Sequence, residues 1–134
     1  MLNIKGRIMI SAILLGAGES KRMGFDKLSL PWGKKTVFEQ CFETLLQSRV
    51  REVVIVRSLR DSRIRNPFHR KEIKMVMNPQ PAGGMSTSIR KGLQAISPGS
   101  DGILIALGDQ PFLKTRTINA LIRAFEATRV WACI

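Results

Sequence analysis

The chain has 134 residues, of which 44% are hydrophobic, and a formal net charge of +12 at neutral pH. This length and apolar fraction predict one globular domain over residues 1–134 rather than a disordered chain. Phenylalanine and tryptophan together make up only 6% and tyrosine is absent, which leaves little surface for stacking bases. We therefore expect no nucleic-acid partner, and no membrane span, because no apolar stretch approaches ~20 residues.

An apolar run over residues 8–15 predicts a buried first strand, and it leads into a glycine-rich run that begins at Leu15. Glycine lets backbone N–H groups approach an anion closely, because no Cβ blocks the approach. Lys21, Arg22 and Lys27 follow within a few residues and could neutralise a polyphosphate. The spacing fits neither a dinucleotide fingerprint nor a Walker A loop. We predict a phosphate-binding loop of another kind, the alternative being an ordinary turn with solvated charges.

The N-terminal segment also resembles a signal peptide, since Lys5 and Arg7 precede the apolar run and small residues follow it. Removing that segment would delete the first strand and separate the glycine-rich run from its support. We therefore expect a cytoplasmic protein.

The next segment holds a short apolar alternation and then a helix start. The alternation over residues 28–30 is stopped by Pro31 and Gly33. Thr36 and Glu39 have the spacing of a capping box, in which the side chain of the first residue accepts a hydrogen bond from the backbone of the second. A helix is therefore predicted to open at Thr36.

Two strands are predicted in the middle of the chain. The continuous apolar run over residues 53–56 is typical of a strand buried on both faces, and residues 73–77 predict another strand. Between them, residues 59–71 are polar and weakly periodic. They predict a short helix interrupted at Asn66-Pro67.

The remaining chain repeats this alternation. Ser86 is predicted to open a helix that ends at Pro98, and residues 102–107 are predicted to form a fourth core strand. Thr115 is predicted to precede a further helix, and residues 130–132 to begin another strand. Short apolar runs separated by helices indicate an α/β fold, a Rossmann-like three-layer α/β/α sandwich with a mostly parallel sheet.

Three unusual loops follow predicted strands, at residues 16–27, 78–88 and 108–111. Ligands of open α/β sheets bind outside the carboxyl ends of the strands. The three loops are therefore expected to meet in one site.

The second and third of these loops carry groups that suit a nucleotide and its metal ion. A helix N-terminus with the hydroxyls of Ser86, Thr87 and Ser88 could bind an anion, although Ser86 could also be a helix cap. Asp109 follows a predicted buried strand, and Mg²⁺ binds through one or two carboxylates together with substrate phosphates. A turn aspartate is the alternative. The neighbouring phosphate-binding loop favours the metal.

Four motifs together resemble the MobA-like nucleotidyltransferase family, whose members attach a nucleotide to the molybdenum cofactor. They are Leu15-Gly16-Ala17-Gly18-x3-Arg22-Met23-Gly24-x2-Lys27, Pro31-Trp32-Gly33-x2-Thr36, Gly84-Met85-Ser86-x-Ser88-x3-Gly92 and Leu107-Gly108-Asp109-Gln110-Pro111. The resemblance runs from about residue 8 to residue 125 and implies a fold of the nucleotide-diphospho-sugar transferase type. Ala17 and the third and fourth motifs are most similar to the molybdenum-cofactor cytidylyltransferases within that family.

The resemblance implies a role for each matching residue. Arg22 and Lys27 would contact the triphosphate as catalytic residues, and Asp109 would bind Mg²⁺. The implied nucleotide-binding residues are Leu15, Gly16, Ala17, Gly18, Arg22, Lys27, Gly84, Met85, Ser86 and Ser88. Members of the family run to roughly 200 residues, a usual size for one domain, so this chain is expected to lack the C-terminal part of its domain.

The implied reaction moves CMP from CTP, or GMP from GTP, to the terminal phosphate of a molybdopterin-type cofactor and releases pyrophosphate. A molybdoenzyme is a possible partner. Two alternatives stay open: a pyrophosphorylase for another phosphorylated acceptor, and a nucleotide- or cofactor-binding accessory protein of a molybdoenzyme without catalysis.

Overall fold

The computed structural model describes residues 8–16, 30–57, 71–78 and 83–128. In chain order, its strands and helices are β1 (Ile10–Gly16), β2 (Pro31–Trp32), β3 (Lys35–Thr36), α1 (Val37–Gln47), β4 (Glu52–Arg57), β5 (Glu72–Met77), α2 (Met85–Ala95), β6 (Gly102–Leu107) and α3 (Thr115–Thr128).

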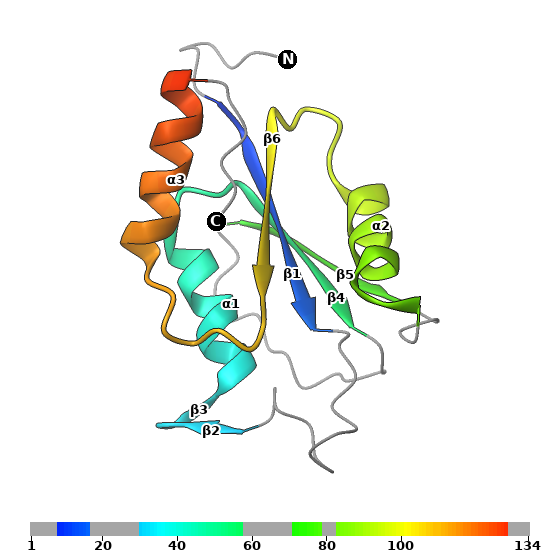
Figure 1. Ribbon diagram of the computed structural model, residues 1–134, viewed down its shortest axis with the longest axis vertical. Coiled ribbons are helices and arrows are strands. Elements are labelled where there is room, and N and C mark those ends of the chain that lie inside the picture. Colours follow the sequence, from blue (N-terminus) through cyan, green and yellow to red (C-terminus); the bar gives the residue numbers. More distant parts are fainter. Residues whose placement is uncertain (1–7, 17–29, 58–70, 79–82, 129–134) are drawn as a thin grey trace.

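Four parallel strands form the central sheet in the order β5-β4-β1-β6 (Figure 1). At the middle of the sheet, Ile13 of β1 pairs with Val54 of β4 on one side and with Ile105 of β6 on the other. Every residue of β1 and β4 is buried. This confirms the prediction that residues 53–56 form a strand covered on both faces.

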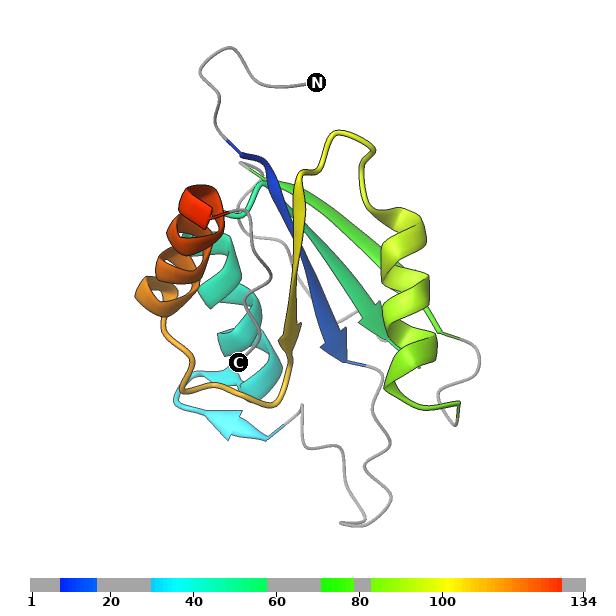
Figure 2. The ribbon, with the colours of Figure 1, turned by 45° about the horizontal axis from the view of Figure 1, so that its top comes forward.

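Helices cover both faces of the sheet (Figures 1 and 2). Helices α1 and α3 lie on one face, where Leu14 and Ile55 pack with Phe38 of α1. Helix α2 lies on the other face, where Ile13 and Val54 form a second apolar cluster. The three layers confirm the predicted α/β/α sandwich with a parallel sheet.

The helix starts agree with the sequence to within a residue. Thr36 is the N-cap of α1, and its hydroxyl accepts a hydrogen bond of 3.2 Å from the backbone N–H of Glu39, as the capping-box spacing predicted. Helix α2 begins at Met85 rather than Ser86, with Gly84 as its N-cap. Helix α3 begins at Thr115 itself.

Two features differ from the sequence-based expectation. Pro31 and Gly33 do not simply stop an apolar alternation, because β2 and β3 form a two-residue antiparallel hairpin whose turn holds Gly33 at a φ of +62°. Among the described residues, β6 is the edge strand of the sheet rather than a fully covered strand, and Ile103 and Ile105 are 42% and 46% exposed. Its neighbour β1 takes the central position, so α2 covers β1 and leaves one face of β6 open.

Some predictions cannot be followed in the structure. The helix expected over residues 59–71 and the strand expected over residues 130–132 fall outside the described residues, apart from Lys71. Within the described ranges, no helix is both long and apolar enough to cross a bilayer.

Candidate functional site

The carboxyl ends of the four parallel strands lie at one edge of the sheet, and helices α1 and α2 begin near that edge (Figure 1). Strand β1 ends at Gly16, which pairs with Arg57 at the end of β4, and Arg57 in turn pairs with Met77 at the end of β5. The described ends of the three predicted loops therefore meet at one edge, as the parallel topology requires.

Gly108 ties the loop after β6 to the end of β1. Its N–H donates a hydrogen bond of 3.0 Å to the carbonyl of Leu15. A Cβ at this position would lie 2.6 Å from the ring of Phe38 and 2.9 Å from the Leu15 carbonyl oxygen, so only glycine fits. The next residue, Asp109, is therefore held beside the start of the glycine-rich run.

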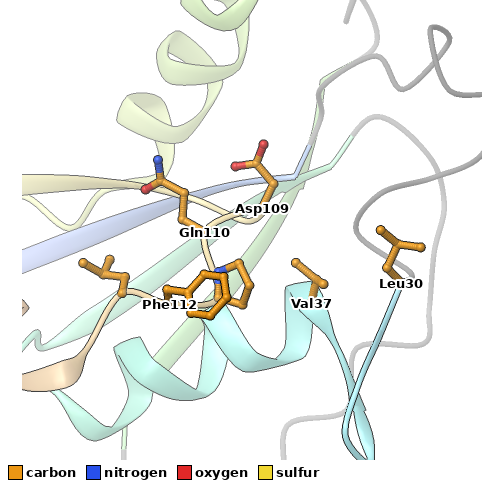
Figure 3. A pocket seen from close by; sticks show the side chains of 7 residues that line it. Leu30, Val37, Asp109, Gln110 and Phe112 are labelled. Carbon is orange, nitrogen blue, oxygen red and sulfur yellow. The ribbon is translucent and has the colours of Figure 1, made fainter.

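The carboxylate of Asp109 is exposed, and no hydrogen bond or ion pair to it is found in the described part of the chain. Figure 3 shows it pointing to the side of its loop on which α2 lies. The described residues contain no group of three metal-ligating side chains. An unpaired carboxylate of this kind fits Mg²⁺ only as one of its ligands, with substrate phosphates and water completing the set.

Asn78 holds the start of α2 against the end of β5. It is 1% exposed, and its amide nitrogen donates to the hydroxyls of Thr87 and Ser88 at 2.8 and 2.9 Å. Thr87 also donates to the carbonyl of Gly84 at 2.7 Å. Ser88 is buried and turned toward the sheet, whereas Ser86 is exposed.

The N-terminus of α2 is open to solvent. Gly84 adopts a φ of +89°, and no side chain caps the first turn of the helix. Met85 and Ser86 are both exposed. Free N–H groups and the helix dipole at such a terminus favour an anion.

Arg57 is a residue at this edge that the sequence analysis does not identify. The structure buries it to 7% exposure at the end of β4, with its guanidinium 4.9 Å from the centre of the Phe38 ring. Its position in the sequence indicates this placement: Arg57 directly follows the apolar run over residues 53–56, and so must lie at the carboxyl edge.

A cavity of about 650 Å³ opens beside Asp109 on the side of the loop nearer α1 (Figure 3). Its wall is apolar except at one end. The lining residues are Leu30, Val37, Asp109, Gln110, Pro111, Phe112 and Leu113. This cavity could not be predicted from the sequence, because its lining combines the residue before the β2–β3 hairpin with a loop about eighty positions later.

Cys41 lies in α1 close to the loop that carries Asp109, and it is 6% exposed. Burial raises the pKa of its thiol; a backbone hydrogen bond from Gln110 opposes this, and the nearby Asp109 carboxylate adds to it. The thiol therefore stays protonated at neutral pH and serves to pack the loop.

The predicted site residues divide into two sets. Those that the structure brings to the carboxyl edge are Leu15, Gly16, Gly84, Met85, Ser86, Ser88 and Asp109. Those that lie outside the described residues are Ala17, Gly18, Arg22 and Lys27.

The chain is similar to several known proteins. The profile of the MobA-like NTP transferase domain matches residues 12–134. The purine catabolism protein PucB of Bacillus subtilis (strain 168) is 32% identical over 118 residues, a match that covers 82% of this chain and 58% of PucB. The molybdenum cofactor cytidylyltransferase of Escherichia coli (strain K12) is 29% identical over 105 residues, covering 78% of this chain and 53% of the enzyme.

Among solved structures, Rv0371c of Mycobacterium tuberculosis H37Rv superposes with a TM-score of 0.74 at 26% identity, covering 90% of this chain and 62% of that protein. A structure of Rv0371c in complex with manganese gives a TM-score of 0.69 at 24% identity, which shows the shared fold. The chain thus spans less than two thirds of the length of these relatives.

Proposed function

This chain belongs to the MobA-like NTP transferase family, and from that premise we propose that it is a Mg²⁺-dependent cytidylyltransferase. The proposed reaction transfers CMP from CTP to the terminal phosphate of a molybdopterin-type cofactor. An oxygen of that phosphate attacks the α-phosphorus of CTP, the bond from the α-phosphorus to the oxygen bridging to the β-phosphate breaks, and pyrophosphate leaves.

The observation that carries this proposal is the position of Asp109. The Gly108–Leu15 hydrogen bond holds this exposed carboxylate next to the end of β1, where the glycine-rich run begins. A metal ion held there by Asp109 and by phosphate oxygens would neutralise charge as pyrophosphate departs. A divalent-metal requirement is part of this proposal; Rv0371c, which shares the fold, has been solved in complex with manganese.

The other proposed site residues would position the substrates and neutralise their charge, rather than form a covalent bond to a substrate. We propose that Arg22 and Lys27 contact the triphosphate, and that the open N-terminus of α2 at Met85 and Ser86 receives another part of the nucleotide. Ala17 supports cytidine over guanosine through the family resemblance. No nucleophilic side chain is required for a direct transfer between phosphates.

Asp109→Asn tests the proposal. It keeps the size of the side chain and removes its charge, so Mg²⁺-dependent CTP binding should be lost, and pyrophosphate release should fall by about 100-fold. Calorimetric titration of CTP and GTP with and without Mg²⁺, together with a pyrophosphate assay in the presence of the cofactor acceptor, measures both quantities.

The matched control is Asp101→Asn, at the residue directly before β6 and thus at the opposite edge of the sheet. The amide that replaces the carboxylate keeps an oxygen that can accept the Met9 N–H, now bonded to Asp101 at 2.8 Å. CTP binding by this variant should equal that of the parent. Absence of any nucleotide binding by the parent protein would refute the enzyme proposal, and Mg²⁺-dependent binding without turnover would instead support a binding protein.

A further inference from the structure

Phe112 is the most exposed of the large apolar side chains in the described part of the chain, at 75%. It lies three residues after Asp109 and lines the cavity of about 650 Å³ beside that carboxylate. An aromatic ring that stays exposed to water does not contribute the stabilisation that its burial would give to the folded state. Its position at the mouth of a cavity of ligand-binding size suggests that a bound molecule covers it.

The ring of Phe112 is held in place before any ligand arrives. It meets the ring of Trp32 at a centroid distance of 4.8 Å and an interplanar angle of 86°, an edge-to-face contact of the favourable kind. Trp32 belongs to the short β2–β3 hairpin, which is closed by the hydrogen bond of 2.8 Å from the Val37 N–H to the Leu30 carbonyl. The Leu113 N–H donates to the Gln110 carbonyl at 3.2 Å and closes the loop that carries Phe112.

The cavity lining separates into an apolar part and a polar end. Leu30, Val37 and Phe112 provide apolar surface, and Asp109 and Gln110 provide the polar groups. In Figure 3, both polar side chains point to the α2 side of the loop, and Phe112 and Val37 lie on the α1 side. Such a site suits a flat ring with apolar faces. An anionic group attached to that ring would approach Asp109 through the Mg²⁺ ion that the proposed function places there.

We propose that this cavity binds the planar heteroaromatic ring of the acceptor substrate, stacked on Phe112, with the acceptor phosphate directed toward Asp109. The inference rests on the proposed function, and it adds the residues of this chain that would hold the acceptor. The nucleotide is expected on the side of Asp109 where α2 begins, whereas the cavity lies on the side of α1. Donor and acceptor would thus lie on opposite sides of Asp109, and an in-line displacement needs the acceptor oxygen to reach the α-phosphorus from the face opposite the departing pyrophosphate.

Trp32 provides a reporter for the test. In a Trp131→Phe background it is the sole tryptophan, and its emission should be quenched when a ring binds beside Phe112. The probe is 6-carboxypterin, a planar heteroaromatic acid, titrated with and without an excess of ribose 5-phosphate. We expect saturable quenching that ribose 5-phosphate does not prevent, because this sugar phosphate has no ring to stack.

Two variants separate stacking from apolar burial. Phe112→Leu keeps an apolar side chain but removes the ring, and it should weaken pterin binding by roughly tenfold, whereas Phe112→Tyr should retain it. At 75% exposure neither change disturbs the core, and circular dichroism checks this. Calorimetric CTP binding in Mg²⁺ should be the same in Phe112→Leu and in the parent.

Equal pterin affinity in Phe112→Leu and the parent would overturn the inference. So would a loss of CTP affinity in Phe112→Leu, because the nucleotide base would then occupy the cavity. Pterin binding that depends on Phe112 in a protein that binds no nucleotide would refute the proposed function and leave the ring site standing.

Discussion

Glu52 is buried to 2% exposure at the start of β4, at the edge of the sheet opposite the candidate site. Its carboxylate accepts hydrogen bonds from the Ser11 hydroxyl at 2.6 Å and from the backbone and hydroxyl of Ser97 at 2.8 Å each. The ammonium group of Lys74 lies 3.3 Å away. Burial raises the pKa of Glu52, but the bonds from Ser11, Ser97 and Lys74 outweigh it and lower the pKa to about 2.

Acid should therefore destabilise the protein through Glu52. A carboxyl whose pKa falls from 4.5 unfolded to about 2 folded contributes its full stabilisation above pH 4.5 and loses it as the pH falls toward 2. The difference corresponds to up to about 3 kcal/mol of unfolding free energy. Urea unfolding between pH 7 and pH 2 measures it, and Glu52→Gln should be less stable at pH 7 and show a flatter acid dependence.

Glu72→Gln is the control for this experiment. Glu72 pairs in register with Glu52 on the neighbouring strand, but its side chain is 58% exposed. Its acid dependence should match that of the parent. If Glu52→Gln retains the full acid dependence of the parent, other carboxyl groups carry it and the role assigned to Glu52 is wrong.

At the level of elements, α2 lies against the sheet through a glycine. A Cβ at Gly92 would come within 2.7 Å of the Cγ2 of Ile13, a fully buried residue of β1. Glycine inside a helix usually costs about 0.5–1 kcal/mol relative to alanine. Here the absence of a Cβ allows α2 to pack closely on β1, and this packing positions the helix N-terminus at the candidate site.

Gly92→Ala should therefore lower stability, against the usual trend, by about 1–3 kcal/mol because of the clash with Ile13. Gln94→Ala, at an exposed position of the same helix, should stay within about 0.5 kcal/mol of the parent. Urea unfolding measures both.

A double-mutant cycle tests the physical reason. Combining Gly92→Ala with Ile13→Ala should cost less than the sum of the single changes, since the second substitution makes room for the new methyl group. Additive costs would show that the clash with Ile13 is not the cause.

Across the whole molecule, the two faces of the sheet are covered unequally at the β6 edge. Strand β6 has no charged residue and no proline, and Ile103 and Ile105 are more than 40% exposed. Ile13, the register partner of Ile105 on β1, is fully buried under α2. An apolar edge without charges is a template for pairing with another strand, which the high net charge of +12 opposes.

Ile105→Lys should leave the thermal midpoint almost unchanged and delay aggregation at high protein concentration, because the charge lies in water at the edge. Ile13→Lys, at the matching position of the central strand, should abolish cooperative folding. Thermal denaturation by circular dichroism and light scattering measure the two effects. An Ile105→Lys variant that unfolds like Ile13→Lys would contradict the exposure of this face.

Local sequence patterns were enough to predict the alternation of strands and helices, the capping box at Thr36 and the meeting of the loops after β1, β5 and β6. These depend on local periodicity and on the rule that parallel strands end at one edge. Three features could be learned only from the folded chain: β6 lies at the edge of the described sheet, Arg57 is buried beside Phe38, and Trp32 contacts Phe112. These features depend on strand order and on contacts between segments that are far apart in the sequence. Such contacts form only when the whole chain folds, so no local sequence pattern encodes them.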